Sequence, residues 1–313
     1  MNFHQLKIFY TVAQQQSITA AAFDLRLTQP AVSQQVKALE TELGIALFER
    51  GGQKKLRLTQ AGEALYRCTV TILHAKDEAE RIIAELGAAT KGKLILGANT
   101  TGGMYLLPRI VRAFKERHPE TEIIFQIEST EWLYEKILEN VVDLAIVGGP
   151  TEDRRFGVEA ICMDRLALIA SPSHHLANTA KVSLKDLKDL PFIVPAQGSR
   201  TRQLVERELK AAGITPNVVM QLMGTEAVKK AVAANLGIGF VSQYAVEQEA
   251  PLAELKVISM DGFEFQRDME LIYRKHKYFS PVAARFREFV HSYAREHLPA
   301  ARSAKRAVLK SVR

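Results

Sequence analysis

The stretch from Ser17 to Glu40 constrains the fold of this chain more than any other, because two short helical patterns follow each other there across three residues. The first pattern has Ser17 as a candidate N-cap and is rich in alanine, whose small side chain lets a second helix cross closely. The second begins at Thr28, whose hydroxyl can cap a free backbone N–H, and has Pro30 in its first turn. Two helices and a tight turn predict a helix-turn-helix at residues 18–37.

The second helix of this pair has an apolar face and a polar face. Val32, Val36 and Leu39 form an apolar stripe at helical spacing. Glutamine can bind adenine in the major groove, and lysine or serine can bind phosphate, so the polar face suits DNA. Simple solvation explains most polar helix faces, and it is the alternative here. As a DNA-recognition helix it would contact DNA through Thr28, Gln29, Pro30, Ser33, Gln34 and Lys37.

A basic hairpin is expected after the recognition helix. Apolar segments at 46–50 and 56–58 flank a glycine turn, which predicts two paired strands and a wing. Basic side chains on a wing contact phosphate beside the groove and add affinity without reading sequence. An exposed charged turn is the alternative. The expected wing contacts are Arg50, Lys54, Lys55 and Arg57, and they complete a winged helix-turn-helix domain at 1–59.

A long helix is predicted at 60–87, with Thr59 as its N-cap. Apolar and small residues recur in it with alternating steps of three and four, the pattern of a coiled-coil seam. Such a helix spans roughly 40 Å, more than its own small domain can cover, so a second copy is expected to cover it. Packing on the chain's own second domain is the alternative. The seam residues are Leu65, Cys68, Ile72, Ala75, Ala79, Ile82 and Leu86.

The first 62 residues carry a dense set of family positions. They are Leu6, Phe9, Val12, Ser17-Ile18, Ala21-Ala22, Leu25, Thr28 to Ser33, Leu39-Glu40, Leu43-Gly44 and Leu47 to Arg50. This pattern closely resembles LysR-type bacterial transcription regulators, although the family often has an aromatic residue at Ile18. The resemblance extends more loosely to about residue 297. It implies a homodimer that assembles as a dimer of dimers, with RNA polymerase among its partners. A two-fold dimer would read an inverted repeat in double-stranded DNA.

Beyond a hinge of small residues at 88–92, strand and helix patterns alternate, which predicts an α/β domain with a mostly parallel sheet at 93–297. The LysR resemblance implies a fold like periplasmic binding proteins, with lobe I at 93–162 and 268–297 and lobe II at 163–267. Residues 298–313 form a basic tail that supplies five of the seven net positive charges. The tail is expected to be disordered, so net charge does not carry the DNA-binding interpretation.

Polar residues follow several predicted strands, where α/β sheets bind ligands and helix N-termini favour anions. The resemblance implies that these positions line an effector cleft, and helix capping is the alternative role of each hydroxyl. Arg200 and Arg202 favour an acidic or phosphorylated metabolite, with a surface salt bridge as the alternative. Residues 198–241 resemble regulators of carbon-fixation and sulfur-assimilation operons. The expected effector-binding residues are Asn99, Thr100, Thr101, Ser129, Thr130, Gln197, Gly198, Ser199, Arg202 and Thr225.

The sequence has no motif for a catalytic nucleophile, a phosphate loop or a metal site, so no enzyme activity, cofactor or metal is expected beyond a small-molecule co-inducer. Cys68 and Cys162 lie too far apart in the sequence to suggest a metal site. No segment has the apolar run of a membrane span or a signal peptide, which favours the cytoplasm. We therefore expect a sequence-specific DNA-binding transcription regulator that responds to a small anionic metabolite. The alternative is a solute-binding or enzymatic α/β domain with an accessory DNA-binding module.

Overall fold

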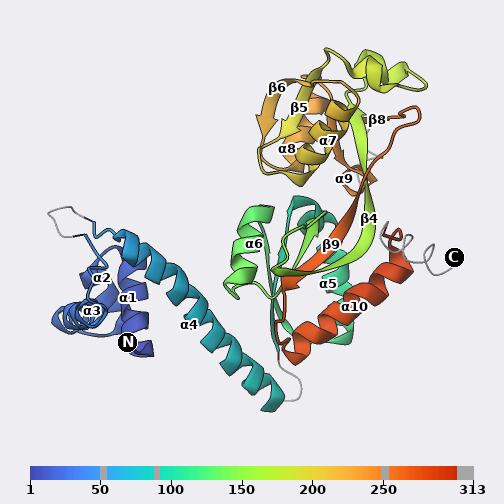
Figure 1. The fold of residues 1–313 in the computed structure, drawn as a ribbon. Coiled ribbons are helices and arrows are strands. Elements are labelled where there is room, and N and C mark those ends of the chain that lie inside the picture. The colour runs from blue at the N-terminus through green and yellow to red at the C-terminus, as the bar shows by residue number, and fades with distance from the viewer. Residues whose placement is uncertain (50–54, 88–91, 248–253, 302–313) are drawn as a thin grey trace. The chain divides into compact units, whose positions relative to one another are not determined.

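The computed structural model describes residues 1–49, 55–87, 92–247 and 254–301. It divides into two compact units, Met1–Ala84 and Glu85–Arg313, and the division falls within the long helix α4 (Gln60–Gly87) (Figure 1). Three groups of residues from the sequence analysis lie outside the described ranges. They are Arg50 and Lys54 of the wing, residues 88–91 of the expected hinge, and residues 302–313 of the tail.

Three helices form the core of the first unit, namely α1 (Phe3–Gln15), α2 (Ile18–Leu25) and α3 (Gln29–Leu43). Helix α2 begins as predicted, because the Ser17 hydroxyl accepts a hydrogen bond from the Ala20 N–H at 3.2 Å. The helices meet through a compact apolar cluster. Its buried members include Ile8, Phe9, Val12, Ala21, Val32, Val36 and Leu39.

Helix α3 starts at the predicted residue by a different interaction from the predicted one. Thr28 is its N-cap, but the Thr28 hydroxyl makes no capping hydrogen bond, so that part of the prediction is wrong. Pro30 lies in the first turn, where a missing N–H leaves no bond unmade, and it suffices to set the helix direction. Gly44 ends the helix with a φ of 67°, a left-handed conformation that favours glycine.

The wing is joined to the core at its base. Phe48 and Leu58 form an isolated antiparallel bridge, and the Glu49 N–H donates to the Arg57 carbonyl at 2.9 Å. The Glu40 carboxylate of α3 accepts hydrogen bonds from two backbone N–H groups of the first arm, at 2.7 and 3.2 Å. Within the described residues, the arms therefore pair at a single bridge instead of along two extended strands.

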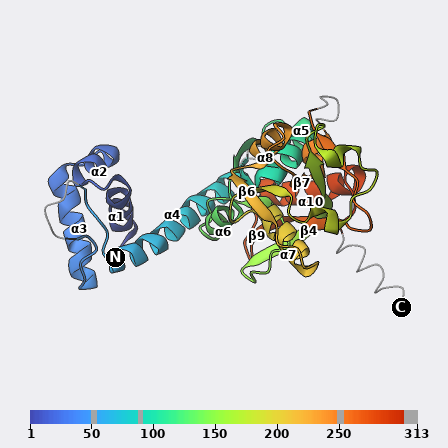
Figure 2. The ribbon, with the colours of Figure 1, turned by 90° about the horizontal axis from the view of Figure 1, so that it is seen from above.

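Helix α4 begins after Thr59 as predicted, because the Thr59 hydroxyl accepts from the Gly62 N–H at 3.0 Å and donates to the Ala46 carbonyl at 2.8 Å. Figure 2 shows α4 as one continuous helix. Its first turns pack on the core of the first unit, where Leu65 is partly buried. The expected seam residues Cys68, Ala75, Ala79 and Leu86 are exposed in the single chain. Their exposure leaves them free to contact a second copy.

The described part of the second unit contains a seven-stranded sheet in which β2, β1, β3, β9, β4 and β7 lie in that order, while β8 also pairs with β4. A separate parallel pair is formed by β5 and β6. The strands are β1 (Lys93–Ala98), β2 (Glu122–Ile127), β3 (Leu144–Gly148), β4 (Phe156–Ala170), β5 (Pro191–Pro195), β6 (Asn217–Leu222), β7 (Gly239–Ser242), β8 (Lys256–Ile258) and β9 (Phe265–Arg274).

Helices accompany both parts of this unit. The first lobe has the short π-helix η1 (Gly102–Leu106), α5 (Leu107–Arg117), α6 (Thr130–Leu138) and α10 (Pro281–His297). The second lobe has α7 (Arg200–Ala211), α8 (Thr225–Ala233), α9 (Gln243–Glu247) and the 3-10 turns η2 (His175–Asn178) and η3 (Leu184–Leu187). No helix among the described residues is both long enough and apolar enough to cross a bilayer.

Strands β4 and β9 join the two lobes (Figure 1). They pair antiparallel from Phe156 opposite Arg274 to Leu166 opposite Phe265, with a register shift between Ala160 and Cys162. The periodicity of the sequence gave an α/β pattern, whereas these two crossings were implied only by the family resemblance. The cleft between the lobes therefore lies beside two long, mutually paired strands.

Candidate effector pocket and DNA-binding surface

A pocket of about 350 Å³ opens between the lobes where four strands end. Its lining follows β1 and β2 in the first lobe and β5 and β6 in the second. Nine of the ten expected effector residues line it, although they come from four separate parts of the sequence. They are Asn99, Thr100, Thr101, Ser129, Thr130, Gln197, Gly198, Ser199 and Thr225.

Several helix N-termini meet at this pocket. The Ser129 hydroxyl caps α6 by accepting from the Trp132 N–H at 3.2 Å, and the Ser199 hydroxyl caps α7 at 3.5 Å. Capping is therefore a role that both serines have. Gly224 starts α8 with a φ of 80° and no side-chain cap. The free N–H groups and positive dipole ends of three helices favour an anion at this place.

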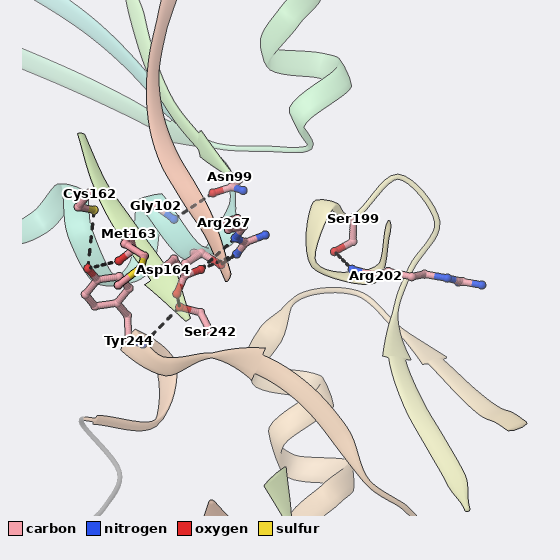
Figure 3. A network of polar contacts seen from close by, with 11 residues as sticks. Asn99, Gly102, Cys162, Met163, Asp164, Ser199, Arg202, Ser242, Tyr244 and Arg267 are labelled. Carbon is pink, nitrogen blue, oxygen red and sulfur yellow. Dashed lines mark hydrogen bonds and ion pairs between the residues drawn. The ribbon is translucent and has the colours of Figure 1, made fainter. Parts of the chain in front are cut away.

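Arg202 is the expected effector residue that does not line the pocket. Its guanidinium donates to Glu206 at 2.6 Å and to Gln221 at 2.9 Å. Figure 3 shows the Arg202 side chain extending away from Asn99. The neighbouring Arg200 does line the pocket. Helical geometry separates the two, because residues two positions apart on a helix point to different sides.

A buried network borders the pocket through Thr101, and sequence reasoning missed its other members (Figure 3). The Thr101 hydroxyl accepts from Arg267 Nη2 at 3.2 Å. Arg267 forms an ion pair with Asp164 at 2.9 Å, and the Ser242 hydroxyl donates to Asp164 at 2.6 Å. Burial raises the pKa of Asp164, and Arg267 and Ser242 oppose that shift. No local motif marks these residues, since they are far apart in the sequence.

The cysteine beside this network is an inert core residue. Burial raises the pKa of the Cys162 thiol to about 12, so the nucleophilic thiolate is scarce at neutral pH. The Tyr244 hydroxyl, also buried beside Cys162, donates to the Met163 carbonyl at 3.1 Å. Among the described residues, no group of three histidine, cysteine or acidic side chains is arranged to hold a metal ion.

The polar face of α3 is open to solvent. Val32, Val36 and Leu39 are buried in the core, whereas the expected DNA contacts on the other faces are accessible. Thr28, Gln29, Pro30, Gln34 and Lys37 are exposed, and Ser33 is half-buried. The wing residues Lys55 and Arg57 are also exposed. This arrangement leaves the side chains of the recognition helix available to a DNA groove.

Comparison with known families accounts for both units. Residues 3–63 match the model described as "Bacterial regulatory helix-turn-helix protein, lysR family", and residues 87–295 match that described as "LysR substrate binding domain". The chain belongs to the LysR family of bacterial transcriptional regulators. It is therefore a DNA-binding regulator with an effector-binding domain.

Relatives of this LysR-type regulator include proteins of carbon fixation. The RuBisCO operon transcriptional regulator of Allochromatium vinosum is 36% identical, over 94% of this chain and 97% of its own length. The transcriptional activator CmpR of Synechocystis is 34% identical, over 93% of this chain and 95% of its own. The carbon-fixation half of the subgroup expectation is thereby confirmed.

Two solved structures have the same fold. The regulatory domain of Synechocystis CcmR, in complex with 2-PG, is 26% identical, covers 66% of this chain and 99% of its own, and has a TM-score of 0.62. CbnR, a LysR family regulator, is 24% identical, covers 94% of this chain and 99% of its own, and has a TM-score of 0.72. The likeness to CbnR concerns the fold alone.

Proposed function

We propose that this LysR-type regulator binds an inverted-repeat promoter site in the cytoplasm through residues 1–59. Dimerisation occurs through the seam of α4 in residues 60–87, and two dimers assemble into a tetramer. Helix α3 reads base edges with residues such as Gln34, while the wing contacts phosphate. Because a two-fold dimer presents two recognition helices, the site has two half-sites. The exposed seam residues of α4 support this proposal.

The effector in this proposal is a small anion bound in the pocket between the lobes, within residues 93–297. The observation that carries it is the convergence of three helix N-termini on a pocket lined by Arg200. Hydroxyls of Thr100 and Thr225 supply further polar groups for a carboxylate or phosphate. Arg200 and the exposed Glu128 are the charged residues of the lining, so a compact anion fits better than a polyanion.

Ligand binding would act on the DNA through the arrangement of the subunits. An anion that contacts both lobes favours the closed cleft over the open one, because it binds the closed form more tightly. Closure changes the assembly equilibrium, hence the angle between paired winged domains and the bend of the DNA. RNA polymerase would respond to that change in bend. Catalytic turnover has no part in this mechanism.

The effector proposal is tested by calorimetry on the full-length protein. We expect 2-PG, the ligand of the CcmR regulatory domain, and inorganic phosphate to bind, whereas uncharged glycerol does not. Thr100→Val removes a lining hydroxyl and should weaken anion binding about tenfold, the usual effect of one lost hydrogen bond. Thr215→Val makes the same chemical change at an exposed position outside the pocket and should have no effect. Equal effects of the two changes would refute the pocket assignment.

A further inference from the structure

A second and larger cavity, of about 830 Å³, lies between the lobes on the other side of Arg200. It is bordered by α6, the segment after β3, α7 and β9. Arg200 lines both cavities, whereas Gln203 and Arg267 line only the second. The two cavities therefore share one guanidinium group and otherwise have different walls.

Two guanidinium N–H groups at this cavity have no hydrogen-bond acceptor. In the described part of the chain, four buried side-chain polar atoms lack a partner, and two of them are nitrogens. Those two nitrogens are Arg200 Nε and Arg267 Nη1, and both arginines line the second cavity. A buried donor without an acceptor is costly and rare in folded proteins. An anion in the cavity would provide the missing acceptor.

Arg267 is held rigidly, as a preorganised binding group requires. Its side chain is only 2% exposed, and its Nε and Nη2 both donate to Asp164, at 3.0 and 2.9 Å. Its remaining terminal nitrogen lies against Gly148, where an added Cβ would come within 2.8 Å of Nη1. A guanidinium fixed on one edge by a carboxylate therefore keeps its other edge free of protein acceptors.

The acidic residues around the cavity define what can enter it. Asp153 is engaged by Arg155, whose Nη2 donates to it at 2.7 Å. Burial raises the pKa of Glu270, whose carboxylate accepts from the Thr151 N–H at 2.9 Å. Four acidic residues, Glu152, Asp153, Asp268 and Glu270, line this cavity and would repel a polyanion. One compact oxyanion near the two arginines avoids most of that repulsion.

We propose that this cavity is a second effector site that binds a single oxyanion group, a carboxylate, sulfate or phosphoryl group, between Arg200 and Arg267. This goes beyond the proposed function, because it requires a second ligand at a place separate from the first pocket. Arg267 also donates to Thr101 of the first pocket and pairs with Asp164 on the strands that join the lobes. An anion at Arg267 therefore acts on the lobe connection and alters the affinity of the first pocket.

Selenate, a heavy analogue of sulfate, tests the location directly. Crystals of the full-length protein grown with selenate should give an anomalous peak within hydrogen-bond distance of the Arg267 guanidinium. A peak in the first pocket alone, or no peak in either cavity, would overturn the proposal. The first of these two outcomes would leave the proposed function intact, so the two ideas fail separately.

Sulfate titration by calorimetry gives the solution test. Gln203→Glu places a negative charge beside Arg200 at an exposed helical position that lines only the second cavity. We expect it to weaken sulfate binding at the second site at least tenfold, while Thr100→Val weakens only the first site. The matched control Gln243→Glu adds the same charge at an exposed residue that lines neither cavity. Unchanged sulfate binding by a folded Gln203→Glu variant would contradict the second site.

Discussion

Arg267 on β9 and Asp164 on β4 form an ion pair across the two strands that join the lobes, with Arg267 Nη2 2.9 Å from Asp164 Oδ2. Their side chains are 2% and 0% exposed, so solvent screens this pair very little. The Ser242 hydroxyl completes the bonding of the carboxylate from the second lobe. The connection between the lobes thus has a charged core that is satisfied on the carboxylate side.

The first prediction concerns this pair. Asp164→Asn leaves the Arg267 charge buried without a counterion, which typically costs about 3–5 kcal/mol. Trp132 is the only tryptophan and lies on α6, so its fluorescence reports unfolding of the second unit alone. Urea unfolding should show the loss. The double variant Asp164→Leu with Arg267→Met removes both charges and should be more stable than the single variant. A loss below about 1 kcal/mol in Asp164→Asn would contradict the burial of this pair.

The second prediction is a pH dependence at Glu159. Although burial opposes the change, hydrogen bonds from Arg287, His291 and Tyr273 lower the pKa of Glu159 to about 2. A folded-state pKa below the unfolded one stabilises the protein above the unfolded value of about 4.3, and this contribution is lost as the pH falls toward 2. We expect Glu159→Gln to lower the free energy of unfolding by about 2 kcal/mol at pH 7.

The pH profile separates this effect from general destabilisation. The difference between Glu159→Gln and the wild type should be constant from pH 7 to about 5 and shrink as the pH falls below that. Glu135→Gln makes the same change at an exposed glutamate of α6, and its effect should be small at every pH. A difference that persists unchanged to pH 3 would show that the carboxylate charge is not the cause.

The third prediction tests the dimer seam. Ala79 and Ala84 are both exposed alanines of α4, but only Ala79 belongs to the predicted seam. Ala79→Glu would bring two like charges together at the interface, so we expect sedimentation to detect monomers at concentrations where the wild type is a dimer. Ala84→Glu should sediment as the wild type does. Dissociation by Ala84→Glu in place of Ala79→Glu would assign the interface to another face of the helix.

The fourth prediction separates reading of bases from binding of phosphate. Gln34→Ala should reduce the preference for the operator over other sequences, because the side chain is exposed on the recognition helix. Lys54→Ala should weaken binding equally on all sequences and reduce the slope of affinity against salt by about one unit. Fluorescence anisotropy with operator and random duplexes measures both quantities. Uniform effects of both substitutions on all duplexes would refute this division.

The sequence was informative wherever the governing interactions are local. Ser17 and Thr59 form the predicted caps, and the periodicity of α4 was visible because a helix repeats every few residues. The ends of strands predicted the pocket lining for the same reason, since each polar group directly follows a strand. Arg202 shows the limit of this reasoning, because its direction depends on Glu206 and Gln221.

Interactions between distant parts of the chain were not visible in the sequence. Asp164 and Arg267 are separated by 103 positions, and neither lies in a pattern that marks a buried charge. Their pairing follows from the register of β4 against β9, which places Asp164 directly opposite Arg267. The second cavity depends on the same register, since β9 forms one of its walls. Both features required the three-dimensional arrangement.

The most direct test of the central claim is a footprint of the full-length protein on DNA upstream of its own gene, with and without 2-PG, at two salt concentrations. Non-specific DNA serves as the control. The account predicts protection of two or more half-sites that survives at the higher salt better than non-specific binding does, and whose extent changes when the anion is added. Equal, weak binding to both DNAs, with no response to the anion, would contradict it.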